Sequence, residues 1–218
     1  MPLDDNAPIV AGGGYIFFAE PDTPKPRRIT DPLNPGPEWT NIGHTSREDL
    51  PEFGRDGDDP ETMGSWQNAK LRQTTPDITY SVTFQALQAS ADVYRFYFGA
   101  DESHVQPDGS VRIPTTPVPQ IKALLVILVD GRKFVPLWHP RASLLGSDAV
   151  EMATDDFVIF PITATFLSSQ LIDGAVGEWA QVLPHRTPGT PPPRRPEGFT
   201  FGFAGATEYA EFERNSQQ

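Results

Sequence analysis

Seven carboxylates lie close together in one stretch of the chain, and they are the residues whose spacing most suggests chemistry. They are Glu48, Asp49, Glu52, Asp56, Asp58, Asp59 and Glu61. Calcium prefers oxygen ligands, so such a stretch could bind the ion if it folded around it. Read from Asp56, however, the calcium-loop template places Pro60 at its fifth position and Glu61 where the turn glycine belongs. A solvated charged loop and an assembly loop remain as interpretations.

Enzyme chemistry finds little support in the sequence. A glycosidase needs two carboxylates held across its substrate, and Glu48 and Glu61 could form such a pair, but no predicted element fixes them relative to each other. The four histidines lie far apart in the sequence, without metal-ligand spacing. No G-x-S-x-G, H-E-x-x-H, P-loop or G-x-G-x-x-G motif occurs. We therefore expect no enzyme activity, no cofactor and no metal site.

The elements that must position these residues are mainly β-strands. Residues 14–20 form an apolar run after three glycines, and residues 77–87 alternate apolar and polar side chains. Asp130 and Gly131 separate two β-rich runs and favour a tight hairpin. Another strand is expected within residues 155–169, where Pro161 favours a sheet edge or a bulge.

One short helix is predicted, over residues 90–98. Ser90 is its expected N-cap, Gly99 its stop, and Val93 and Phe96 share one apolar face. A helix of this length needs a sheet to pack on. With a last strand near 178–183, the fold predicted is an antiparallel β-sandwich or barrel with one flanking helix.

Proline marks the expected boundaries of this domain. Its 24 copies are about twice the average share and cluster in residues 20–39, 112–120 and 183–198. Fixed φ and the missing N–H make such stretches extended connectors. The expected division is an N-terminal arm (1–13), a domain (14–183), a proline-rich linker (184–198) and a C-terminal arm or tail (199–218).

The composition argues against several classes of partner. Without cysteine the chain has no disulfide and no thiolate metal site. The N-terminus lacks the pattern of a signal peptide, and the longest apolar run, Ala123 to Val129, is far shorter than the ~20 residues of a membrane span. A formal charge of −12 disfavours binding to nucleic acid or to anionic membranes.

The stretch from Trp39 to Thr74, WTNIGHTSREDLPEFGRDGDDPETMGSWQNAKLRQT, is followed by ITYSVTFQAL. Together they resemble the major tail proteins, or tail-tube subunits, of long-tailed non-contractile bacteriophages, especially those of actinobacterial hosts. The order of expected elements is also similar, over roughly residues 14–183. The resemblance implies a β-sandwich of the tail-tube type that self-assembles into stacked hexameric rings, the conduit for genome ejection.

The resemblance also implies partners and a location. The partners would be further copies of the chain, the tape measure protein, the tail terminator and the tail-tip proteins. The subunit would be assembled in the host cytoplasm and end in the virion tail. DNA would pass through the lumen without specific binding, since acidic walls repel phosphates.

In such families the long loop after the second strand reaches the neighbouring ring, and this loop corresponds here to Thr45–Gly64. Glycines and mutual acid repulsion would keep it mobile until assembly, with Leu50 and Phe53 as anchors and Glu48 and Asp49 as specificity contacts. The expected interface comprises Trp39, His44, Glu48, Asp49, Leu50, Phe53, Met63, Trp66, Phe199, Phe201 and Phe203.

One alternative of a different class stays open. A monomeric carbohydrate- or receptor-binding β-sandwich of a virion could also be acidic and free of cysteine. It would use exposed aromatic residues as stacking platforms, and Trp66, Trp138 and Trp179 are candidates.

Overall fold

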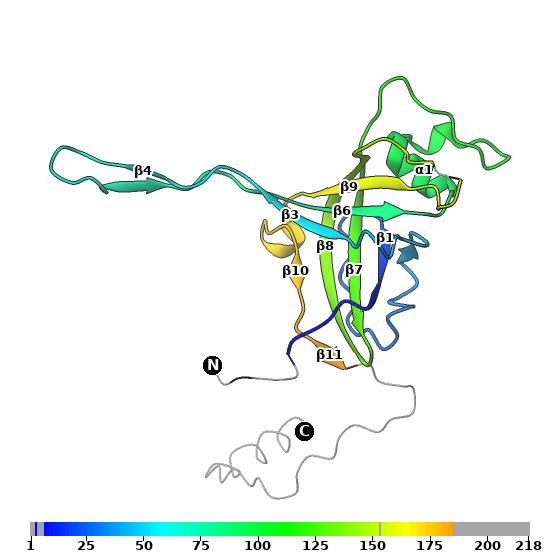
Figure 1. The fold of residues 1–218 in the computed structure, drawn as a ribbon, viewed down its shortest axis with the longest axis horizontal. Coiled ribbons are helices and arrows are strands. Elements are labelled where there is room, and N and C mark those ends of the chain that lie inside the picture. The colour runs from blue at the N-terminus through cyan, green and yellow to red at the C-terminus, as the bar shows by residue number, and fades with distance from the viewer. Residues whose placement is uncertain (1–2, 4–6, 153, 185–218) are drawn as a thin grey trace, which may run out of the picture. The chain divides into compact units, whose positions relative to one another are not determined.

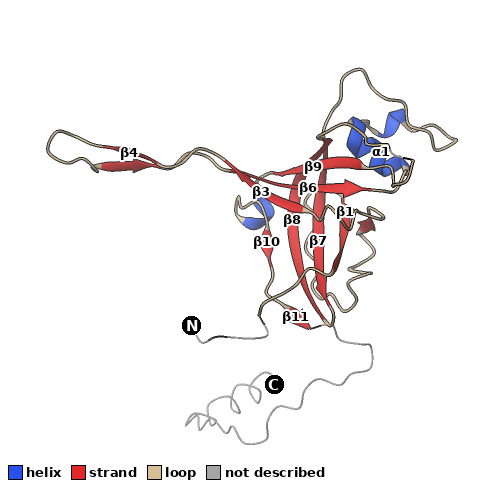
Figure 2. Ribbon diagram, viewed as in Figure 1, coloured by secondary structure: helices blue, strands red, loops and turns tan. Residues whose placement is uncertain are grey.

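A long antiparallel sheet organises the chain in the computed structural model, which describes residues 3, 7–152 and 154–184. These residues belong to one compact unit, Met1–Thr187. The sheet has nine strands, and seven of them follow each other in the order β2, β1, β7, β8, β9, β6, β3. Figure 1 shows their arrangement, and Figure 2 shows how little helix accompanies them.

The strand bounds agree with most of the sequence predictions. The seven strands are β1 Gly13–Ala19, β2 Thr40–Asn41, β3 Glu52–Asp56, β6 Thr79–Ala86, β7 Gln120–Asp130, β8 Lys133–Gly146 and β9 Phe160–Phe166. Two short strands, β10 Glu178–Trp179 and β11 Leu183–Pro184, also pair with β8. The hairpin predicted at Asp130 and Gly131 is confirmed, because Asp130 pairs with Lys133 and Gly131 has a φ of 55°.

The 14 residues of β8 join the two parts of the sheet. Its first part pairs with β7, and its last residues, Ala142 to Gly146, also pair with β9. In Figure 1 the strands β9, β6 and β3 run across β7 and β8. The sheet thus curls over itself and encloses a core, as in sandwiches whose strands cross.

Both faces of β7 are buried, which explains why its sequence is apolar without alternation. Leu124 and Val126 belong to the larger core cluster, with Phe84, Leu144 and Ile162. Alternate residues, Leu125 and Ile127, belong to a second cluster on the other face, with Phe17, Trp39 and Trp138. The predicted antiparallel β fold is confirmed.

The single α-helix, α1 Ala91–Phe98, forms as its sequence predicts. The Ser90 hydroxyl accepts the N–H of Val93, and Gly99 ends the helix in the left-handed region. Val93 and Phe96 are buried, and the Phe96 ring packs edge-on against Phe18 at 4.9 Å. Two 3-10 turns, Glu102–His104 and Gln170–Ile172, complete the described helical structure. No helix in the described part of the chain is long and apolar enough to cross a bilayer.

Pro161 lies inside the sheet, so the predicted edge or bulge is wrong. Strand β9 pairs with β8 on one side and with β6 on the other, without a register shift on either. The β8 ladder ends at the pair Gly146 and Ile162, and the Pro161 carbonyl accepts the N–H of Ser147 at 3.1 Å. The missing N–H points toward the same side, beyond the last ladder pair, where the sheet does not need it.

Candidate assembly interface

The acidic stretch is part of a β-hairpin, not of an irregular loop. Strand β3 pairs with β6 up to the pair Asp56 and Thr79. Beyond it the chain continues as β4 Glu61–Met63 and β5 Arg72–Thr74, which pair only with each other among the described strands. We call residues 57–77 the arm. Every arm residue except Pro76 is exposed, and Figure 2 shows the arm reaching away from the sheet.

The sequence accounts for the point at which the arm leaves the sheet. Gly57 has a φ of 154°, which residues with a side chain rarely adopt, and a Cβ there would lie 2.9 Å from the Asp77 carbonyl oxygen. Pro60 and Pro76 cannot donate to a ladder. The β3–β6 pairing therefore stops at Asp56, and a second, separate ladder begins further out.

The arm ends in a tight turn, whose residues 63–72 we call the arm tip. The Ser65 N–H donates to the Asn68 carbonyl at 2.7 Å, and the Leu71 N–H donates to the Met63 carbonyl at 2.9 Å. Trp66 is fully exposed, at 102% of its reference area, and Met63 and Leu71 are more than half exposed. An exposed apolar group of this size is typical of a surface that another molecule covers.

Charges are separated along the arm. Its base carries the acids, which are Asp56 at the end of β3 and then Asp58, Asp59, Glu61 and Asp77. From Thr62 to Pro76 the only charged residues are Lys70 and Arg72. The arm tip is thus basic in an acidic protein. Among the described residues, no three acids, histidines or cysteines converge as metal ligands would.

A groove of about 510 Å³ lies between the start of β1, residues 45–53 and β7, and we call it the β1 groove. Tyr15, Leu50, Phe53 and Leu128 give it apolar walls. The hydroxyl of the buried Ser46 accepts the N–H groups of Glu48 (3.2 Å) and Asp49 (3.1 Å), which bends the chain beside the groove. Glu48 and Asp49 are consequently exposed, between the lining residues Arg47 and Leu50.

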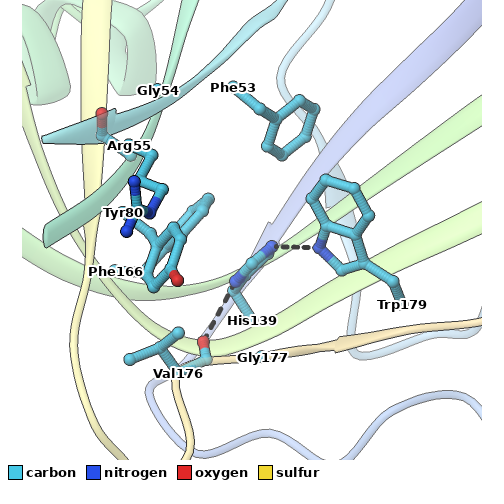
Figure 3. A pocket seen from close by; sticks show the side chains of 10 residues that line it. Phe53, Gly54, Arg55, Tyr80, His139, Phe166, Val176, Gly177 and Trp179 are labelled. Carbon is cyan, nitrogen blue, oxygen red and sulfur yellow. Dashed lines mark hydrogen bonds between the residues drawn. The ribbon is translucent and has the colours of Figure 1, made fainter. Parts of the chain in front are cut away.

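A second cavity, of about 320 Å³, lies beside the base of the arm and is lined by aromatic rings (Figure 3). The Phe53 ring meets the Trp179 ring edge-on at 5.0 Å, and the His139 ring stacks on Phe166 at 3.5 Å. The Trp179 Nε1–H donates to His139 Nε2 at 3.2 Å, so the His139 proton lies on Nδ1 and is donated to the Val176 carbonyl at 3.0 Å. We call this cavity the aromatic pocket.

His139 is neutral in this environment. Burial disfavours the imidazolium and lowers the pKa of His139 to about 4, although its hydrogen bond to the Val176 carbonyl acts in the opposite direction. The ring therefore serves as a packing and hydrogen-bonding group that ties β10 to β8.

The structure separates the residues predicted as one interface. Trp39 is only 7% exposed, in the second core cluster, so the folded subunit does not offer it to a neighbour. Phe53 is half-buried on its own subunit's rings, whereas Leu50 opens into the β1 groove. His44, Glu48 and Asp49 are exposed, and Met63 and Trp66 lie in the arm tip. Phe199, Phe201 and Phe203 lie outside the described residues, as do the predicted C-terminal arm and all but the first residue of the linker.

Three residues of the arm tip were missed by the sequence analysis, which ended the loop at Gly64. Lys70, Leu71 and Arg72 belong to the returning half of the hairpin. A signal was present, because Glu61–Met63 and Arg72–Thr74 can pair across the turn residues Ser65 to Asn68.

Comparison with known proteins gives consistent matches. A family model described as phage tail tube protein matches residues 1–181. The major tail protein Gp23 of Mycobacterium phage D29 is 32% identical over 180 residues, covering 78% of this chain and 89% of the relative. The major tail protein Gp23 of Mycobacterium phage L5 matches with the same identity and coverage.

Proposed function

This chain belongs to the phage tail tube protein family and is a structural component of a phage tail, and from this premise we propose that it forms hexameric rings which stack into the tube for genome ejection. The family is structural and not enzymatic. The exposed arm tip carries the proposal, because Met63, Trp66 and Leu71 have no cover within the described part of their own subunit.

The arm also explains why assembly would continue along one axis. An arm tip and the surface that receives it are different parts of the subunit, so the contact between them is heterologous and need not close. Contacts of this kind propagate as a filament, while a separate lateral contact would close each ring. The domain at residues 14–183 would form the wall of the tube, with the arm crossing from one ring to the next.

Other parts of the proposal rest on the family and on charge. The tape measure protein would fill the lumen during assembly in the host cytoplasm, and the terminator and tail-tip proteins would bind the two ends. A net charge of −12 per subunit favours a lumen that repels DNA phosphates, so that the duplex slides without specific binding.

The alternative, a monomeric carbohydrate- or receptor-binding module, receives less support from the described residues. Trp138 is 3% exposed and cannot serve as a stacking platform, and the Trp179 ring already packs against Phe53. Trp66 is exposed, but it lies on a narrow hairpin without a neighbouring pocket wall.

The proposal is tested with the purified full chain and a variant in which residues 58–76 are replaced by a short Gly-Ser turn. The wild type at high concentration should give tubes or rings in negative-stain electron microscopy and matching masses in light scattering. The armless variant should keep the circular dichroism of the sheet and lose the tubes. A wild type that stays monomeric, or an armless variant that forms equal tubes, would contradict the proposal.

A further inference from the structure

We infer that the β1 groove is the receiving site for the arm tip of another copy of this chain. The inference rests on the proposed assembly and assigns both sides of its axial contact. It joins an exposed apolar and basic tip to a groove that has apolar walls and acidic residues beside it.

The arm tip cannot reach the β1 groove of its own subunit while the hairpin stays extended. Phe53, which lines the groove, is in β3, the strand that leads directly into the arm. From Gly57 to Trp66 an extended chain covers roughly 30 Å at about 3.3 Å per residue. The tip therefore lies far from the base from which the arm starts, and a second copy must supply the contact.

Charge distinguishes the β1 groove from the other two cavities. Lys70 and Arg72 make the tip basic, without an acid between Thr62 and Pro76. In the aromatic pocket, Arg55 is the only formally charged residue among the described lining residues. A third cavity, of about 340 Å³, is lined by Lys25, Arg27 and Arg28, and its single acid, Glu178, already pairs with Lys25. Both cavities would repel the tip.

The β1 groove has the opposite charge. Glu48, Asp49 and Glu52 are exposed beside its lining residues, against one arginine, Arg47. Two cations of the tip and three acids of the groove give a complementary pair that both attracts and orients the partner. These acids were predicted as specificity contacts of a loop that binds elsewhere, and the structure places them instead on the receiving side.

Size and surface chemistry agree with this assignment. The groove holds about 510 Å³, more than either of the other cavities, which suits an indole together with the smaller Met63 and Leu71 side chains. Leu50 is 48% exposed and would be covered by the incoming tip. Apolar anchors surrounded by complementary charges are the usual arrangement of residues that dominate an interface.

The start of β1 adds main-chain groups to the groove. The Ile42 N–H donates to the Ile16 carbonyl at 3.0 Å, so the main-chain groups of Ile16 point away from β7. Those of Gly14, two residues earlier, point the same way. Within the described chain β2 pairs with β1 only at Phe17 and Phe18, which leaves the Gly14 groups open toward the groove. The amide of Gln67, next to Trp66, is a suitable partner for them.

Paired cysteines test the assignment directly, because the natural chain has none. Gln67→Cys marks the arm tip and is combined with Arg47→Cys in the β1 groove. Two matched controls combine it with Arg55→Cys in the aromatic pocket or Arg27→Cys in the third cavity, so each double variant loses one arginine. After oxidation of concentrated protein, only the Arg47 pair should give a ladder of covalent multimers on a non-reducing gel, at least ~10-fold above either control.

Mixing separates contacts between copies from contacts within one. Equal amounts of the two single variants, Gln67→Cys and Arg47→Cys, should give a covalent dimer of one copy of each. Electron microscopy of the reduced samples reports assembly independently. Tubes without the Arg47 ladder, or with a ladder from Arg55 or Arg27, would overturn this assignment and leave the proposed function standing. Absence of tubes from the wild-type chain would remove both.

A charge reversal gives a second readout that does not depend on oxidation. Lys70→Glu with Arg72→Glu should raise the concentration needed for assembly at least ~10-fold, because the tip then repels the groove. Adding Glu48→Lys and Asp49→Lys should restore assembly toward the wild-type concentration. Failure of this rescue, with a folded quadruple variant, would count against the pairing.

Discussion

At the scale of single residues, the neutral His139 links stability to pH. Its ring is held between the Val176 carbonyl and the Trp179 indole, and an imidazolium cannot accept the indole N–H. The tie between β8 and β10 therefore depends on the unprotonated ring. Arg55 and Glu178 are the charged side chains on the elements packed around it, and the exposed Glu178 does not offset the burial of the ring.

We expect stability to fall below pH 6.5. The folded-state pKa of His139 is about 4 against 6.5 for the free side chain, so above pH 6.5 both states are neutral and its contribution is complete. Between pH 6.5 and 4 only the unfolded chain binds the proton, which lowers the unfolding free energy by up to ~1.4 kcal/mol per pH unit. Urea unfolding at pH 7.5 and 5 should show a larger loss for the wild type than for His139→Gln.

The matched control is His44→Gln, because His44 is exposed. Its pH dependence should equal that of the wild type. If His139→Gln loses as much stability between the two pH values as the wild type does, the neutral state assigned to His139 is wrong.

At the scale of elements, β3 and the arm have different roles although they are continuous in sequence. Phe53 in β3 packs on Trp179 and lies 6.3 Å from the Phe166 ring, so it stabilises the domain. Trp66 in the arm tip packs on no ring of its own subunit among the described residues. One aromatic residue therefore contributes to folding, and the other is available for assembly.

Two alanine variants should separate these roles. Phe53→Ala should lower the unfolding free energy of the dilute monomer by about 3 kcal/mol, since it removes a large packed side chain. Trp66→Ala should leave that free energy within ~0.5 kcal/mol of the wild type and raise the assembly concentration at least ~10-fold. Chemical unfolding and light scattering measure the two quantities. An unchanged assembly concentration for Trp66→Ala would show that the arm tip makes no important contact.

At the scale of the whole molecule, the C-terminal segment is a proposed second contact between copies. The aromatic residues Phe199, Phe201 and Phe203 could anchor it on a neighbour, as the sequence analysis expects. Truncation at Pro188 removes this segment and leaves the unit Met1–Thr187 complete. We expect an unchanged monomer melting temperature and tubes that are shorter or that dissociate at lower temperature. Tubes of wild-type length and heat stability would identify a dispensable tail.

The sequence by itself determined the local elements. Ser90 and Gly99 fixed both ends of α1, and Gly131 fixed the β7–β8 hairpin, because capping and turn geometry depend on neighbours within a few residues. The motif spanning Trp39 to Thr74 was also sufficient to indicate the family. Alternation in residues 77–87 predicted the inner face of β6, although Tyr80, near the arm, is 39% exposed.

Only the tertiary structure decided which surfaces are free. Pro161 is interior because β6 and β8 approach β9 from distant parts of the sequence, and Trp39 is buried because the chain before β2 covers the second core cluster. The same long-range pairing turned an acidic loop into an arm and moved Phe53 into the domain. Burial depends on contacts between residues far apart in sequence, and local patterns carry little information about such contacts.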